Sequence, residues 1–129
     1  MKMEHVACNV AEPAAMADWY VQHLGMRIVR AADTPHCVRF VAAAGGSGMI
    51  EIYHNPAAPV PDYAAMDPLV LHLAFHSDDV DADCQRLVQA GATVVQAPLT
   101  SPAGDRLAML RDPWQVALQL VHRDKPMET

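Results

Sequence analysis

The sequence predicts an α+β fold of two tandem modules, each made of a strand, a helix and three further strands. Two short stretches that each begin with a histidine, residues 5–10 and 72–77, resemble each other. A helical pattern follows each stretch, and each half ends in an alternating strand that carries one polar side chain, Glu51 or Gln119. Internal repetition of this kind is the signature of a fold that repeats one supersecondary unit.

In the first half, residues 5–10 are predicted to form a strand, and a helix is predicted from Pro13 to Leu24. Proline suits the first turn of a helix, where its missing N–H is no loss, and Gly25 is a typical residue just beyond a helix end. The apolar side chains that recur at helical spacing are Met16, Trp19, Tyr20 and Leu24. Three further strands are predicted at residues 26–30, 37–41 and 49–54, with a turn at 45–48.

The second half repeats this order after a proline-rich segment. Residues 55–68 contain four prolines and little periodicity, which predicts a linker. The strand signal returns at residues 69–76, and Ser77-Asp78-Asp79 then offers side-chain oxygens and negative charge to a helix start. The apolar stripe of this helix, which is expected to end at Gly91, consists of Val80, Cys84, Leu87 and Val88. The last three strands are predicted at residues 93–95, 106–110 and 116–122.

The chain has the size of one domain, because its 129 residues allow one substantial core. The expected divisions of that domain over residues 1–129 are a module at about 1–55, a linker at about 56–68, a module at about 69–123 and a tail at 124–129. The net charge of −6, without a basic cluster, argues against binding to nucleic acid. Three widely spaced cysteines, no secretory leader pattern and no apolar run near the roughly 20 residues of a membrane span predict a reduced cytoplasmic protein.

Strand parity places four polar side chains on one side of the predicted sheets. Side chains alternate between the two faces of a strand, so the large aliphatic residues belong against the helices and the polar residue belongs on the opposite face. The four residues on that opposite face are His5, Glu51, His72 and Gln119. A polar group between apolar neighbours is costly unless it is paired, and its repetition suggests a shared cavity. Two imidazoles, a carboxylate and an amide oxygen form a suitable shell for a divalent metal.

Other polar residues are weaker candidates. Four of them could line such a cavity and contact a substrate: Asn9, Arg39, Tyr53 and His76. Among these, His76 shares the parity of His72 but lies near the end of its strand. The remaining histidines are expected to be solvated: His23, His36, His54 and His122.

Short motifs that match a known family are spread over nearly the whole chain. They are His5-Val6-Ala7, Trp19-Tyr20, Leu24-Gly25-Met26, Ile50-Glu51-Ile52, His72-Leu73-Ala74-Phe75, Asp78-Asp79-Val80 and Arg111-Asp112-Pro113. In this order and spacing, the chain resembles the vicinal oxygen chelate superfamily, which includes glyoxalase I, bleomycin-resistance proteins and extradiol dioxygenases. The resemblance implies two βαβββ modules that form a curled mixed sheet around a central cavity, with the helices outside. It also implies a homodimer, in which His5 and Glu51 of one chain share a metal shell with His72 and Gln119 of the other.

Two residues depart from the family pattern. Many metalloenzymes of the superfamily carry glutamate at the Gln119 position, and in glyoxalase I this glutamate is a metal ligand that takes part in proton transfer. Members similar to methylmalonyl-CoA epimerase use two histidines, one glutamine and one glutamate, and this chain resembles them with the amide and the carboxylate exchanged between the halves. Gln115 stands where the family usually has glycine, a change that we expect to alter the backbone turn.

The resemblance implies a metal-dependent enzyme of lyase or isomerase type that acts on a small oxygen-rich substrate through a stabilised oxyanion. The metal would be Ni, Co, Zn, Mn, Mg or Fe, and Glu51 would serve as its ligand, as the catalytic base, or as both. The alternative is a metal-free small-molecule binding protein of the bleomycin-resistance kind, in which His5 and His72 only form hydrogen bonds. A second alternative is an Fe(II) dioxygenase with iron held by His5, Glu51 and His72.

Overall fold

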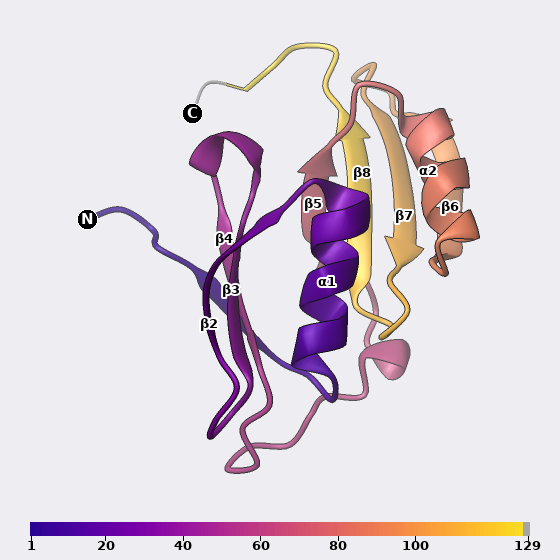
Figure 1. Ribbon diagram of the computed structural model, residues 1–129. Helices are drawn as coiled ribbons and strands as arrows, with labels where there is room; N and C mark the ends of the chain where they lie inside the picture. The colour runs from indigo at the N-terminus through magenta and orange to yellow at the C-terminus, as the bar shows by residue number, and fades with distance from the viewer. Residues whose placement is uncertain (128–129) are drawn as a thin grey trace. The chain divides into compact units, whose positions relative to one another are not determined.

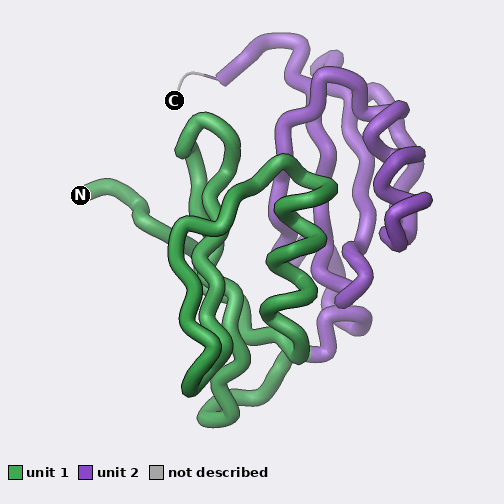
Figure 2. The backbone as a smooth tube through the Cα atoms, in the orientation of Figure 1, with its two compact units in different colours: residues 1–61 green, residues 62–129 purple. Residues whose placement is uncertain are grey.

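The computed structural model describes residues 1–127 and has two compact units, the first ending at Pro61 and the second beginning at Asp62 (Figure 2). Each unit is one βαβββ module with its own four-stranded mixed sheet (Figure 1). The fold class predicted from the sequence is therefore confirmed. The unit boundary falls among the residues predicted as a linker, and the predicted tail includes residues 128–129, which lie outside the described part. Within residues 1–127, neither helix is long and apolar enough to cross a bilayer.

In the first unit, the strands are ordered β1-β4-β3-β2, with β1 parallel to β4 and the other neighbours antiparallel. The elements are β1 Val6–Asn9, α1 Pro13–Leu24, β2 Arg27–Ala32, β3 Val38–Ala42, the 3₁₀ turn η1 Ala44–Gly46 and β4 Met49–Tyr53. Helix α1 packs against β2, β3 and β4. Each element predicted for this half is present, with its ends shifted by at most about two residues, as is usual for sequence-based boundaries.

The second unit has the same topology, with the strand order β5-β8-β7-β6 and a parallel pair between β5 and β8. The elements are the 3₁₀ turn η2 Tyr63–Ala65, β5 Leu73–His76, α2 Val80–Gln89, β6 Thr93–Thr100, β7 Arg106–Arg111 and β8 Ala117–His122. Helix α2 packs against β6, β7 and β8. Strand β6 continues well beyond its predicted end at residue 95.

Burial in the first unit follows the predicted strand parity and helix stripe, except that Leu24 of the stripe is only partly buried. Ile50 and Ile52 are 7% and 0% exposed and belong to the core, while Glu51 between them is only partly buried. The buried side chains of α1 are Pro13, Met16, Ala17, Trp19 and Tyr20. The helix ends where Gly25 adopts φ +67°, a left-handed conformation typical of glycine just after a helix.

Two further details of the second unit differ from the sequence prediction. Strand β5 begins at Leu73 rather than at residue 69, because Asp67, at the end of the predicted linker, closes a turn. The Asp67 carboxylate accepts a hydrogen bond from the Leu69 N–H (2.8 Å), and its carbonyl accepts one from the Val70 N–H (2.9 Å). Val88, predicted for the apolar stripe of α2, is 43% exposed.

The parallel pairs of the two sheets have the same register. Ala7 of β1 lies opposite Glu51 of β4, and Ala74 of β5 lies opposite Gln119 of β8. In each unit, the histidine of the repeated motif stands two residues before this alanine. The repeat seen in the sequence is therefore also a repeat of the backbone structure. Glu51 and Gln119 occupy equivalent positions in their two modules.

Candidate functional site

The first unit brings His5 and Glu51 together. Nε2 of His5 lies 3.0 Å from Oε2 of Glu51, and Nδ1 of the same ring lies 3.2 Å from Oε2 of Glu4. The side chains of His5 and Glu51 are 30% and 22% exposed, so a small molecule or ion can reach both. The Glu4 side chain is 72% exposed and precedes the sheet, whereas Glu51 is fixed in a central strand.

The sheet and one aromatic ring hold this pair in place. His5 directly precedes β1, and Glu51 lies in β4, which runs parallel to β1. Phe40 of β3 lies opposite Glu51, and its ring meets the His5 ring edge to face, with centroids 5.5 Å apart and an interplanar angle of 90°. Such a contact favours one orientation of the imidazole. Nε2 is thereby kept towards the carboxylate.

The separation of the two donor atoms fits a shared divalent cation. Imidazole nitrogen and carboxylate oxygen bind such ions at about 2.0–2.2 Å, which places donors at right angles roughly 3 Å apart. Without a cation, 3.0 Å is also the length of a hydrogen bond between an imidazole N–H and a carboxylate. One neutral nitrogen and one anionic oxygen suit ions of the series from Mn²⁺ to Zn²⁺. The residues present therefore fit a metal.

The second unit holds His72 and Gln119 in the equivalent places, both partly buried. Nδ1 of His72 lies 2.8 Å from the carbonyl oxygen of Pro68. Because a carbonyl only accepts, Nδ1 is the N–H donor, and Nε2 carries the lone pair of the neutral ring. This arrangement is the usual one for a histidine that ligates a metal through Nε2.

The weaker candidates of the first unit are engaged by the protein itself. The Asn9 amide accepts from the Asn55 N–H at 2.8 Å. Its Nδ2 also donates, at 3.0–3.3 Å, to the carbonyl oxygens of Asn55, Ala58 and Pro59. Arg39 pairs with Asp33 at 2.7 Å, and its side chain is 14% exposed. Tyr53 is partly buried and shares the strand parity of Glu51. These contacts tie Asn9 and Arg39 to neighbouring residues of the first unit, and their role towards a substrate stays a prediction.

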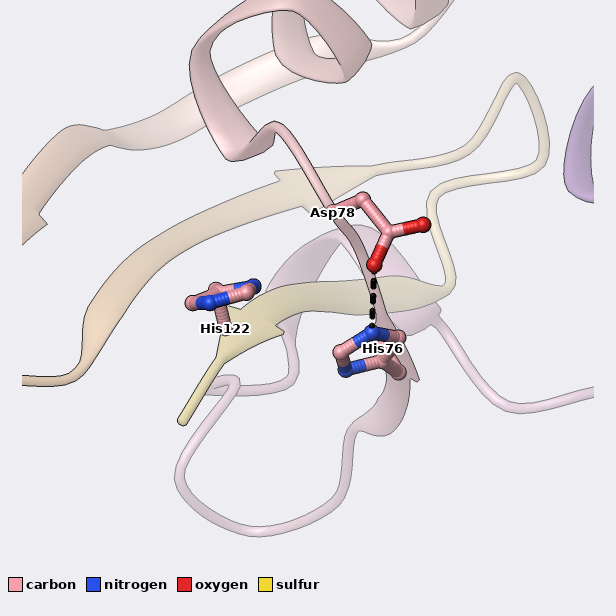
Figure 3. Close-up of side chains that lie close together, drawn as sticks. All are labelled: His76, Asp78 and His122. Carbon is pink, nitrogen blue, oxygen red and sulfur yellow. Dashed lines mark hydrogen bonds and ion pairs between the residues drawn. The ribbon is translucent and has the colours of Figure 1, made fainter. Parts of the chain in front are cut away.

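The fourth weaker candidate, His76, belongs to a cluster that sequence reasoning missed (Figure 3). Nε2 of His76 lies 3.0 Å from Oδ1 of Asp78, and the His76 and His122 rings are 5.6 Å apart between centroids. One ring nitrogen of each histidine and one Asp78 oxygen lie within 4.8 Å of one another, and all three residues are exposed. His122 is solvated, as expected, but it is not isolated. The sequence does show that each of two predicted strands ends in a histidine, which is the one sign of this cluster. Only the parallel register of β5 and β8 brings these two strand ends together.

The turn between β7 and β8 shows how the departure at Gln115 is accommodated. Gln115 adopts φ +73°, the left-handed conformation that glycine tolerates best. The fully buried Asp112 holds the turn, because its Oδ1 accepts from the N–H groups of Trp114 (2.9 Å) and Val116 (3.0 Å). The guanidinium of Arg111 donates to three backbone carbonyls, those of Tyr63, Met66 and Gln115. The turn is thus formed in spite of the side chain at position 115.

The titratable groups with shifted pKa values are not members of these clusters, although Arg106 and Arg123 lie beside His122. Two hydrogen bonds from Arg106, at 2.7 and 2.9 Å, lower the pKa of the Asp81 carboxyl. A hydrogen bond of 2.9 Å from Arg123, supported by a backbone N–H, lowers the pKa of Asp105. Burial raises the pKa of the Cys84 thiol, which therefore behaves as a core residue.

Several solved structures share this fold. TnmS3, an antibiotic binding protein from Streptomyces sp. CB03234, is 27% identical, with a TM-score of 0.68 over 93% of this chain and 96% of its own. A glyoxalase/bleomycin resistance protein from the same organism is 26% identical, with a TM-score of 0.66 over 91% of this chain and 96% of its own. An E144Q mutant of glyoxalase I from Zea mays is 21% identical, with a TM-score of 0.76 over 97% of this chain but 47% of its own, and shows likeness of fold alone.

The sequence itself also matches a protein family. No curated protein matches the chain at a significant level. A family described as Glyoxalase/Bleomycin resistance protein/Dioxygenase superfamily matches over residues 2–120, which is nearly the whole chain. The repeated modules and their common register are consistent with that match. The chain belongs to the Glyoxalase/Bleomycin resistance protein/Dioxygenase superfamily.

Proposed function

We propose that the protein is a metal-dependent enzyme of lyase or isomerase type that acts on a small, oxygen-rich substrate. The observation that carries the proposal is the 3.0 Å separation between Nε2 of His5 and Oε2 of Glu51, two good metal ligands on one side of a sheet. His72 and Gln119 hold the equivalent places in the second unit, and we propose them as the other ligands. The tautomer that Pro68 imposes on His72 supports this role.

The chemistry follows from the kinds of residue in the set. A divalent ion would supply Lewis-acid stabilisation of a substrate oxyanion. Glu51 is the one carboxylate of the four, so it is both a ligand and the proposed base, which takes a proton from a carbon next to a substrate carbonyl. The contact with His5 orients the carboxylate, and its 22% exposure leaves it accessible to substrate. A single base suits isomerisation, or elimination of a proton next to a carbonyl.

Metal analysis tests the first part of the proposal. Protein purified without a histidine tag or a chelator should contain a divalent metal, or take it up during dialysis against Ni²⁺, Co²⁺, Mn²⁺ or Zn²⁺. His5→Gln should lower the metal content by one ion per chain, because it removes a ligand nitrogen. His23→Gln is the matched control, since this histidine of α1 packs against Trp19 and should not affect the content. An unchanged content in His5→Gln would refute the assignment.

A second candidate function is metal-free binding of a small molecule. It is favoured by the 27% identity with TnmS3, an antibiotic binding protein. In this case His5 and Glu51 form a hydrogen-bonded pair, and an apolar or aromatic ligand should raise the melting temperature in the presence of a chelator. The two candidates are distinguished by metal uptake: His5→Gln lowers it by one ion per chain if the protein is a metalloenzyme, and leaves it unchanged if the protein only binds a small molecule. Oxygen consumption with catechols, after loading with Fe(II), would instead support a dioxygenase.

A further inference from the structure

The cluster of His76, Asp78 and His122 stands on a rigid part of the second unit. His76 ends β5, and His122 ends the neighbouring parallel strand β8. Between His76 and Asp78, the buried Ser77 donates its N–H to Val121 O at 3.0 Å. The chain that carries the ligands is therefore fixed by the sheet, although their side chains reach solvent.

The loop after His76 is fixed on its other side by α2. The Ser77 hydroxyl donates to Oδ2 of Asp83 at 2.6 Å, and the Asp79 carboxylate caps the helix by accepting from the Ala82 N–H at 3.0 Å. Asp78 thus lies between two anchored residues. Its carboxylate is not used as a helix cap and points towards His76 (Figure 3).

Hydrogen bonding prepares one histidine for ligation. Nδ1 of His122 lies 3.0 Å from the carbonyl oxygen of Ser77, so this nitrogen donates and Nε2 of the neutral ring carries the lone pair. A carbonyl behind the ring is a common outer partner of metal-ligating histidines. Arg106 lies opposite His122, but its guanidinium pairs with Asp81. The Asp78 carboxylate therefore stays available to a metal ion.

We propose that His76, Asp78 and His122 form a second, surface metal site for Zn²⁺, separate from the site proposed around His5 and Glu51. Two imidazoles and one carboxylate are a known three-ligand set for zinc, with the remaining position open to water or a ligand. The nitrogen donors disfavour Mg²⁺ and Ca²⁺, which prefer oxygen. Because the ligands are exposed, the affinity is lower than that of a closed structural zinc site. This proposal does not depend on the enzymatic function proposed above.

Zinc titration in a variant that lacks the first set of histidines tests the proposal. His5→Gln/His72→Gln should still bind one Zn²⁺ per chain by calorimetry at a fixed pH, where protonation of histidine is constant. Adding His122→Gln should weaken this binding by at least about tenfold. Even the loss of a residue that only hydrogen-bonds to a metal ligand lowers metal affinity by about 10–100-fold. Adding His54→Gln, which removes an exposed histidine of the first unit, is the matched control and should leave it unchanged.

A spectroscopic measurement covers the case in which the multiple variants fail to fold. In the natural sequence, added Zn²⁺ should shift the imidazole NMR signals of His76 and His122 together, whereas added Mg²⁺ should not. The proposal is wrong if those two signals stay in place while zinc binds. It is also wrong if the His5→Gln/His72→Gln variant is folded and takes up no zinc. Either result leaves the test of His5 and Glu51 unaffected.

Discussion

Nε2 of His5, the residue before β1, lies 3.0 Å from Oε2 of Glu51 in the neighbouring parallel strand β4. The second unit repeats the backbone register of this pair but has Gln119 in place of the glutamate. The two positions therefore have equivalent places in their modules and differ by one negative charge. That charge is the property that most directly affects a divalent cation.

Gln119→Glu should raise the affinity for a divalent metal by about 10- to 100-fold. Two unit charges roughly 4 Å apart at an effective dielectric near 20 interact by about 4 kcal/mol, and desolvation of the new carboxylate removes much of that gain. A second carboxylate also provides a second base, so proton-transfer activity of the glyoxalase kind should appear or increase. Metal titration at one pH measures the affinity.

Glu51→Gln is the counterpart and should weaken metal binding, because it leaves a set of four neutral ligands. The double variant Glu51→Gln/Gln119→Glu restores one carboxylate in the other module and should recover part of the affinity. That recovery separates an effect of charge from an effect of misfolding. If neither single variant changes metal affinity, these positions do not face a metal, and the proposed ligand set is wrong.

The assembly state is a separate prediction. The resemblance to the superfamily implies a homodimer, since family members cover the polar faces of their sheets by pairing modules. Light scattering at micromolar concentration should give about twice the chain mass of 14.0 kDa. A mass of one chain that does not change with concentration would contradict the prediction. Adding zinc in this experiment would show whether the exposed histidines link chains.

The ion pairs of the second unit predict an acid-dependent loss of stability. Arg123 holds the pKa of Asp105 below the ordinary 3.8, so in the folded state this carboxyl keeps its charge to lower pH than in the unfolded state. Its contribution is fully present above the unfolded pKa and is lost as pH falls through the folded pKa. Urea unfolding from about pH 6 down to pH 2 should therefore show a shallower decline for Asp105→Asn than for the natural sequence.

Arg123→Gln is the partner test for this pair. It removes the donor rather than the carboxyl, so it should flatten the same part of the acid profile. A profile for either variant that runs parallel to the natural one would mean that the pair does not contribute. The Asp81–Arg106 pair is expected to behave in the same way, because hydrogen bonding lowers the pKa of Asp81.

The sequence predicted the parts of the fold that depend on local pattern and repetition. Parity placed Ile50 and Ile52 in the core and Glu51 on the other face, and the structure agrees, because alternation is a property of any strand. Gly25 ended α1 as expected, since a left-handed residue is needed there. The shared register of the two sheets follows from the same repetition.

The parts that sequence reasoning missed depend on contacts between distant residues. The hydrogen bonds of Asp67 delay the start of β5, and no periodicity in the apolar run from Leu69 reveals them. The grouping of His76 with His122 needs the parallel register of β5 and β8, which is not visible in either strand alone. The pattern along one strand thus predicts which face of the sheet a side chain occupies. Which side chains from different strands lie close together follows only from how the strands pair.

Gln115→Gly should stabilise the protein by about 0.5–1 kcal/mol. Gln115 adopts φ +73°, where a side chain costs roughly 1–2 kcal/mol, and the greater freedom of glycine in the unfolded chain offsets part of the gain. The hydrogen bonds of the turn use only the backbone of residue 115, so the substitution keeps them: its N–H donates to Asp112 O at 2.9 Å, and its carbonyl accepts from Arg111 at 3.0 Å. Gln85→Gly, in the exposed middle of α2, is the matched control and should destabilise the protein by about 0.5–1 kcal/mol. A helical φ strains no side chain, so glycine relieves nothing there and only adds freedom to the unfolded chain. Urea unfolding of both variants at neutral pH measures the difference, and a Gln115→Gly variant that is less stable than the natural sequence would show that the glutamine side chain makes contacts worth more than the backbone strain.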